Sequence, residues 1–375
     1  MRVLSWARRN QARLIRSIRE FVECESPTDS PVDVGWFQDL LTESVADIGI
    51  VRRTPEGALV CKFLLSGSEK QGQILVLGHA DTVWPLGTLK TMPFRRAEGR
   101  LWGPGVLDMK AGLAFFIFAM HALRDLDIPV AHEVVLLVNP DEETGSKTSR
   151  AGTEALAAKS KAVLVLEPGS GLEGKVKTAR KGIGEYRLKV RGIAAHAGVD
   201  FERGASAVLE LARQVERIAA FTDLARGITV NPGAISGGTR SNVIAAEASA
   251  HIDIRVPRTI EAGLLDRKFR SLKPFDKRCS IELTGGLNRP PMERTKPIAA
   301  LFALARGLAA EMNVDLEESS TGGGSDGNFT AALGIPTLDG LGAVGEGAHA
   351  MDESILIDRI PDRVALLAKL TAAIS

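Results

Sequence analysis

The stretch QILVLGHADTVWP, residues 73–85, decides the predicted fold. It opens with consecutive apolar residues and ends with a histidine, an aspartate and a turn-forming proline. Consecutive apolar residues over so short a run are typical of a strand that is buried on both faces of a parallel sheet. We therefore expect His79 and Asp81 at the carboxyl end of this strand, the edge at which open α/β sheets bind ligands.

Comparable apolar runs occur on both sides of this stretch, and helical patterns separate them. The predicted strands are ALVCKFLL at 58–65, EVVLLVN at 133–139 and AVLVLE at 162–167, and the predicted helices are 9–23, 32–47 and 111–126. Buried strands that alternate with helices indicate an α/β fold, with a mixed, mostly parallel sheet flanked by helices.

The pattern changes after Lys175. Residues 182–192, GIGEYRLKVRG, alternate between polar and apolar, as a half-exposed antiparallel strand does. A helix at 204–221, strands at 227–236 and 247–256, a helix at 259–272 and a strand at 279–285 follow. This β-α-β-β-α-β order predicts a ferredoxin-like α+β domain. We place it at 178–289, inserted into a larger domain formed by 1–177 and 290–375.

The composition excludes several classes of protein. The 375 residues include 47 Lys+Arg and 46 Asp+Glu, and this balance argues against a nucleic-acid or acidic-membrane binder. The three cysteines are far apart, which fits a reducing compartment. The basic N-terminus lacks the apolar core of a signal peptide, and GLAFFIFAM at 112–120 is too short to span a bilayer. We expect a soluble, cytoplasmic protein.

Six residues on five segments have the chemistry of a metal site. They are His79, Asp108, Glu142, Glu143, Glu167 and His349. Zinc binds imidazole nitrogen and carboxylate oxygen, and paired cations lie about 3.5–4 Å apart, a gap that one carboxylate can bridge. Two imidazoles and four carboxylates are enough for a pair of divalent cations, with one residue left over to act as a base.

Spacing suggests roles for two of the neighbouring residues. Asp81 is two residues after His79, where it can accept a hydrogen bond from the ring and orient it. Glu142 and Glu143 are adjacent, so one can bind metal while the other faces substrate and water as a general base. Structural alternatives exist for single residues, because DEETGS also resembles a solvated turn and Asp108 also suits a helix N-cap.

Together, GHADTVWP, GPGVLDMKAG, DEETGS, LEP and GAHAMDE resemble a zinc-dependent exopeptidase family. This family comprises glutamate carboxypeptidase (carboxypeptidase G), aminoacylase, acetylornithine deacetylase and succinyl-diaminopimelate desuccinylase. The resemblance covers nearly the whole chain and implies a dizinc exopeptidase-like catalytic domain. It implies that Asp108 bridges both cations, that His79 and Glu167 complete one site, and that Glu143 and His349 complete the other.

The same resemblance implies a reaction and a cofactor. Glu142 is expected to be the base and Asp81 to support His79. The cofactor is expected to be two divalent ions, zinc first, with cobalt or manganese as alternatives. GHADTVWPLGTL and PFRRAEGRLWGPGVLDMKAG are most similar to the glutamate carboxypeptidase branch, although Glu167 stands where some carboxypeptidases have Asp. A carboxypeptidase that releases a glutamate-like residue is therefore predicted. An N-acyl-amino-acid deacylase is the alternative, and a non-catalytic metal- or peptide-binding homologue is the third.

On the substrate side, the resemblance implies a role for one histidine, and the residue types of four further positions suggest substrate contacts. His196 in AAHAG is expected to donate to the oxyanion, within its own subunit or across a dimer, unless this segment is a simple turn. Asn242 and Arg289 are expected to contact substrate, with the Arg289 guanidinium suited to a carboxylate. Gly323 and Gly324 could let the backbone approach the substrate. The family also implies a homodimer through the inserted domain, acting on small peptides or N-acyl amino acids.

Overall fold

The computed structural model describes residues 2–67 and 70–374, and these form two compact units. The first unit contains Met1–Ala179, Arg294–Ser320 and Ser325–Ser375, and the second contains Arg180–Glu293 with Thr321–Gly324. The short return at 321–324 lies outside the predicted insertion of 178–289. It joins the second unit because Lys181 donates its backbone N–H to the carbonyl of Thr321, 3.0 Å away.

A six-stranded sheet forms the centre of the first unit, in the order β1-β2-β6-β3-β7-β16. Strands β6, β3, β7 and β16 are parallel, whereas β1 and β2 are antiparallel. The bounds are β1 Gly49–Arg53, β2 Leu59–Phe63, β3 Gln73–His79, β6 Glu133–Asn139, β7 Ser160–Val165 and β16 Thr337–Leu338. The predicted mixed, mostly parallel sheet is confirmed.

Helices cover both faces of this sheet. The larger core lies between the sheet and helices α1, α2, α3, α7 and α9, and a smaller core lies on the other face beside α4. The bounds are α1 Arg2–Glu23, α2 Pro31–Val45, α3 Ala111–Asp125, α4 Arg150–Ala157, α7 Lys296–Ala310, α8 Gly327–Ala332 and α9 Ile360–Ala373. The first helix begins at Arg2, earlier than the predicted residue 9, because Val3, Leu4 and Trp6 are buried in the larger core.

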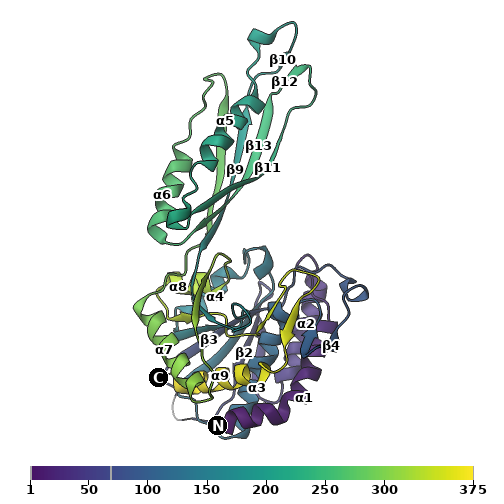
Figure 1. Cartoon of the computed structure of the whole chain (residues 1–375), viewed down its shortest axis with the longest axis vertical. Coiled ribbons are helices and arrows are strands. Elements are labelled where there is room, and N and C mark those ends of the chain that lie inside the picture. The colour runs from purple at the N-terminus through teal and green to yellow at the C-terminus, as the bar shows by residue number, and fades with distance from the viewer. Residues whose placement is uncertain (1, 68–69, 375) are drawn as a thin grey trace. The chain divides into compact units, whose positions relative to one another are not determined.

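Helix α3 lies in the middle of the larger core, beside α1 and α9 (Figure 1). The segment Val106–Asp125 has the length and hydropathy of a membrane-spanning helix. Its side chains are nevertheless buried inside the unit, which is typical of a core helix.

Short strands complete the first unit. Strands β4 Arg95–Ala97, β5 Arg100–Trp102, β17 Gly345–Glu346 and β18 Ser354–Leu356 form a small antiparallel sheet. The chain leaves this unit through β8, Val176–Arg180, which pairs with β15, Glu318–Thr321.

The second unit is a four-stranded antiparallel sheet with two helices on one face (Figure 1). Its order is β11-β13-β9-β14, the arrangement expected for a ferredoxin-like β-α-β-β-α-β chain. The bounds are β9 Gly182–Arg191, α5 Ala207–Ala219, β11 Thr229–Gly237, β13 Glu247–Val256, α6 Thr259–Arg270 and β14 Ser280–Arg289. A small pair, β10 Ala195–His196 and β12 Val243–Ile244, extends from it.

Candidate metal centre

The ends of three parallel strands bring most of the predicted site together. His79 is the last residue of β3 and pairs with Asn139, the last residue of β6. Glu142 begins a tight helical turn directly beyond β6, and Glu167 lies two residues beyond β7. Because parallel strands present their carboxyl ends at one edge, side chains from segments far apart in sequence meet there.

Asp108 reaches the same edge from the irregular turn Val106–Lys110 that precedes α3. Two glycines allow α3 to pack this closely against the strands. A side chain at Gly112 would overlap the carbonyl oxygen of Leu166, and one at Gly78 would lie 2.7 Å from the side chain of Leu113. The close approach places Asp108 beside His79.

One half of the cluster centres on His79. Its Nε2 lies 3.2 Å from Asp108 Oδ1 and 3.7 Å from Glu167 Oε1. His79 and Glu167 are buried, and Asp108 is partly buried. The second Asp108 oxygen faces the other half, 3.4 Å from His349 Nε2. His349 Nε2 also lies 3.3 Å from Glu143 Oε2.

These distances place Asp108 between the two imidazoles, with one oxygen toward each. That arrangement suits a bridging ligand. The individual ligand assignments stay predictions.

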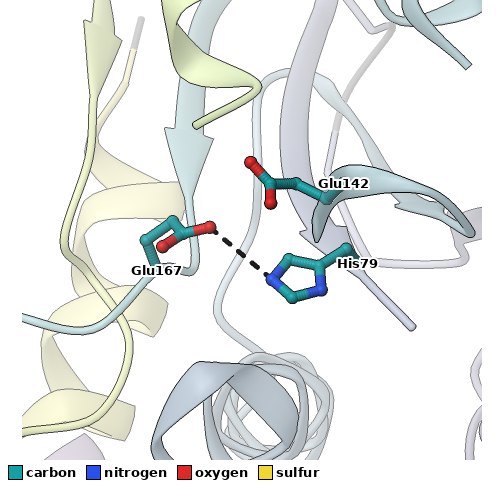
Figure 2. A group of neighbouring side chains, drawn as sticks. All are labelled: His79, Glu142 and Glu167. Atoms are coloured by element: carbon teal, nitrogen blue, oxygen red, sulfur yellow. Dashed lines mark ion pairs between the residues drawn. The ribbon is translucent and has the colours of Figure 1, made fainter. Parts of the chain in front are cut away.

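Glu142 enters the His79 half from the turn after β6. One ligand atom from each of His79, Glu142 and Glu167 can be chosen so that all three lie within 4.8 Å of one another. Figure 2 shows the Glu142 carboxylate directed toward the same space as the Glu167 carboxylate and the His79 ring. Glu142 is therefore close enough to His79 and Glu167 to act on the same space.

Asp81 holds three residues of the cluster in place. Its backbone carbonyl lies 2.8 Å from His79 Nδ1 and its carboxylate lies 3.4 Å from the same atom, so the carbonyl makes the shorter contact. The Asp81 carboxylate also accepts the backbone N–H groups of Glu142 at 3.2 Å and Glu143 at 3.1 Å, and the hydroxyl of Thr28 at 2.8 Å. One buried side chain thus fixes the histidine and both glutamates.

The charges of the cluster shift its protonation equilibria. Burial opposes charge on His79, yet the carboxylates of Asp108 and Asp81 raise its pKa well above 6.5. Hydrogen bonding to Asp108 and Glu143 raises the pKa of His349 to about 10. Burial disfavours the ionised Asp108 carboxylate, but the two histidines hold its pKa below the ordinary 3.8. In the absence of cations, protons on the imidazoles balance the carboxylates.

The donor set fits a pair of divalent cations. It offers imidazole nitrogens and carboxylate oxygens, the ligands that zinc takes in hydrolytic sites. Glu143 Oε1 is buried and has no hydrogen-bond partner among the described residues, which is unusual for a buried carboxylate and is relieved by a bound cation.

Two buried acids that sequence reasoning did not select also support the cluster. Glu353 accepts the backbone N–H of Asp108, and Asp326 binds Asn139 and Ser146 on either side of the Glu142 turn. The available signal in the sequence was proximity to residues already selected, since Glu353 ends the GAHAMDE motif and Asp326 is two residues after Gly324.

The remaining predicted residues belong to the second unit. His196 in β10 and Asn242 before β12 are exposed and adjacent, since the carbonyl of Asn242 accepts the N–H of Ala197 at 3.0 Å. His196 Nδ1 accepts the backbone N–H of Gly198 at 3.2 Å. Their predicted contacts with substrate stay predictions.

Arg289 and the two glycines lie together at the base of the second unit. Arg289 is buried, and a side chain at Gly324 would lie 3.0 Å from Arg289 Cδ. The carbonyls of Gly323 and Gly324 accept hydrogen bonds from the guanidinium of Arg180 at 3.2 and 3.0 Å. Arg180, which the sequence did not single out, therefore fixes this loop.

Comparison with known proteins agrees with the geometry. The family model described as "Peptidase family M20/M25/M40" matches residues 75–373. Carboxypeptidase G2 of Pseudomonas sp. (strain RS-16) is 27% identical over 368 residues, covering 96% of this chain and 89% of the relative. Acetylornithine deacetylase of Klebsiella pneumoniae (strain 342) is 30% identical over 274 residues, covering 69% of this chain and 68% of the relative.

A solved structure shares the whole fold. Aminopeptidase PepT from Bacillus cereus ATCC 10987 superposes with a TM-score of 0.81 at 22% identity, covering 97% of this chain and 98% of the other. At this identity the likeness establishes the fold, and the family match establishes the relationship.

Proposed function

The chain belongs to peptidase family M20/M25/M40, and from that premise we propose that it is a two-metal carboxypeptidase releasing a C-terminal glutamate-like amino acid. Membership makes it a hydrolase of amide or peptide bonds. The observation that supports the proposal is the cluster in which Asp108 lies between His79 and His349, with Glu142 beside it.

The proposed cation ligands are Asp108, shared between two sites, with His79 and Glu167 on one side and Glu143 and His349 on the other. Zinc suits this set best, and cobalt or manganese are the alternatives. Bound divalent cations would polarise the substrate carbonyl and make water acidic enough to lose a proton near neutral pH.

Glu142 is the proposed proton carrier. Its backbone is fixed by Asp81, and its carboxylate points into the cluster (Figure 2). We propose that it accepts the proton of the attacking water and returns it to the leaving nitrogen, as general acid–base catalysis requires. His196 is the proposed donor to the oxyanion, from its own chain or from a partner chain.

The proposed preference for an acidic residue rests on Arg289 and on the similarity to a carboxypeptidase over nearly the whole chain. A guanidinium binds a carboxylate through two parallel hydrogen bonds. Replacing Arg289 by alanine should raise KM for substrates with an acidic C-terminal residue more than for neutral amides. Arg255, which pairs with Asp253 at 2.9 Å, is the matched control. An equal loss for both substrate classes would contradict a carboxylate clamp.

A substrate panel tests the function directly. The zinc-loaded protein should release glutamate from N-acyl-glutamates and acidic dipeptides with higher kcat/KM than it shows for N-acetyl basic amino acids. The opposite preference would establish the deacylase alternative, which the similarity to acetylornithine deacetylase supports. Tight metal binding without hydrolysis across the panel would identify a non-catalytic homologue.

We also propose that two copies associate through the second unit. Strand β11 is at the edge of its sheet, and Val208 on α5 lies beside Gly237 on that strand. Leu209 and Ile235 are exposed apolar side chains of the same two elements. Sedimentation should show a dimer that Ile235→Asp weakens. The three free cysteines suit the cytoplasmic location that we propose.

A further inference from the structure

A fully buried glutamate, Glu353, lies behind the cluster and has no role in the reaction proposed above. Its carboxylate accepts four hydrogen bonds. Oε1 accepts the backbone N–H groups of Leu107 at 2.8 Å and Asp108 at 3.0 Å. Oε2 accepts the backbone N–H of Gly105 and the indole N–H of Trp84, both at 2.8 Å.

These four donors come from two of the segments that supply proposed ligands, and Glu353 itself belongs to a third. Trp84 follows His79 in the loop after β3. The three backbone amides form the turn that ends at Asp108. Glu353 is four residues beyond His349, and among the described residues its carboxylate accepts no hydrogen bond from outside these segments. The Glu353 carboxylate therefore connects three loops. Two of them carry His79 and His349, and the third carries Asp108, which lies between these histidines.

The turn before Asp108 depends on this acceptor. Residues 106–110 depart from regular helix, because Asp108 and Met109 have non-helical backbone angles. Backbone N–H groups in such a turn lack the carbonyl partners of a regular helix, and burying an N–H without an acceptor is unfavourable. Glu353 accepts hydrogen bonds from two of these amides, those of Leu107 and Asp108, and from the amide of Gly105. It therefore fixes the backbone position from which the Asp108 side chain extends.

We propose that Glu353 is a positioning residue for cation binding, holding Asp108 in register with the two histidines. The inference rests on the proposed function in one respect only, that the cluster binds divalent cations. A glutamate can do this and a glutamine cannot, because an amide offers one acceptor oxygen and one NH2 group. Whichever way the amide turns, two of the four N–H donors face another donor.

The test is cation affinity of the full chain. Metal-free Glu353→Gln should bind zinc and cobalt roughly 10–100-fold more weakly than wild type, the loss typical when a partner of a ligand is removed. The visible spectrum of the cobalt-loaded variant should differ from wild type, since the carboxylate between the cations is displaced. Excess cation should restore much of the activity, and KM should change less than kcat.

Glu210→Gln is the matched control. Glu210 is equally buried, and its carboxylate accepts the backbone N–H groups of Phe275 at 3.0 Å and Asp276 at 2.9 Å and the amide of Gln214 at 2.8 Å, all within the second unit. The control should lose stability with wild-type cation affinity. An equal loss of affinity in both variants would reduce Glu353 to a general stabiliser and overturn the inference.

Trp84→Phe keeps the test decisive if Glu353→Gln does not fold. It removes one of the four donors and leaves the carboxylate in place, so a smaller loss of cation affinity is expected, and unchanged affinity would overturn the inference. Weakened binding in these variants with no hydrolysis by wild type would sink the proposed function alone. Wild-type cation affinity in Glu353→Gln with normal hydrolysis would sink this inference alone. A wild-type chain that binds no divalent cation would overturn both.

Discussion

The Asp81 side chain holds two adjacent glutamates, Glu142 and Glu143, for which we propose different roles. Its two carboxylate oxygens accept the backbone amides of Glu142 and Glu143, so the two glutamates start from a fixed pair of positions. From there their side chains take different partners. Glu143 contacts His349 and also forms a group with His79 and Asp108, whereas Glu142 forms a group with His79 and Glu167.

The divergence leads to opposite outcomes for two isosteric changes. Glu142→Gln should keep both cations and lose roughly 10²–10⁴-fold in kcat, the usual contribution of a general base. Glu143→Gln should instead lower cation affinity, because it removes the charge next to His349. Elemental analysis and steady-state kinetics on both variants measure this. Lost metal in the first variant, or intact metal and lost turnover in the second, would exchange the two roles.

At the scale of elements, hydrogen bonds hold the turn after β6 next to the start of α8. The buried Asp326 just before α8 accepts the amide of Asn139 at 2.6 Å and the hydroxyl of Ser146, which lie on either side of Glu142. Asn139 also accepts the N–H of Ala80, next to His79, at 2.8 Å. This chain of contacts sets the turn against the end of β3.

Weakening these hydrogen bonds should lower kcat more than it weakens the binding of substrate or metal. Asp326→Asn removes the negative charge and one of the two acceptor oxygens that hold Asn139 and Ser146. A misplacement near 1 Å can cost about 10²-fold in rate. We expect a 10–100-fold lower kcat, with KM and metal content close to wild type. Asp339→Asn is the control, since Asp339 is equally buried and accepts Ser325 Oγ at 2.5 Å. Equal losses in both variants would mean general destabilisation.

Elements with a strong pattern were predictable, and those defined by distant partners were not. The buried strands QILVLGH and EVVLLVN match β3 and β6 residue for residue, because burial on both faces requires continuous apolar side chains. Strands β4, β5, β17 and β18 are two or three residues long and exist through pairing with one another, which no local pattern reveals. The contacts of Glu353 could not be predicted for the same reason, because its hydrogen-bond donors lie about 250 residues earlier in the chain.

The second unit offers a pH prediction. Tyr186 on β9 is the chain's one tyrosine, and its hydroxyl donates to Asp266 on α6 at 2.6 Å. Burial, and then the Asp266 carboxylate, raise the pKa of Tyr186 above its ordinary 10.0. The folded state thus favours the neutral phenol. Its contribution to stability is complete below pH 10 and is lost as the pH rises toward the folded pKa.

Phenolate absorbance measures this directly. The folded chain should ionise above pH 10, and the urea-unfolded chain near the ordinary value of about 10. Tyr186→Phe should abolish the signal and cost about 1 kcal/mol from the lost hydrogen bond. Ionisation of the folded chain at the unfolded value would show that Tyr186 is neither buried nor bound to Asp266 in solution.

Across the whole molecule, the candidate metal site and the tryptophans lie in one unit, and the tyrosine lies in the other. All six residues of the cluster belong to the first unit, and so do the four tryptophans, Trp6, Trp36, Trp84 and Trp102. The single tyrosine belongs to the second unit. Tryptophan fluorescence therefore reports the unit that is proposed to bind metal, and the phenol of Tyr186 reports the other.

Metal removal should destabilise the first unit and leave the second unit unchanged. A ligand that binds only the folded state stabilises it by about 2.7 kcal/mol when its concentration is 100 times Kd. Chelation should lower the melting temperature seen by tryptophan fluorescence, because the folded first unit loses the free energy of cation binding. The pH at which Tyr186 ionises should stay unchanged. If chelation also changed the pH at which Tyr186 ionises, the structure of the second unit would depend on the cations as well. If it shifted neither, the cluster would not bind cations at the concentrations used, and the two-metal proposal would fail with it.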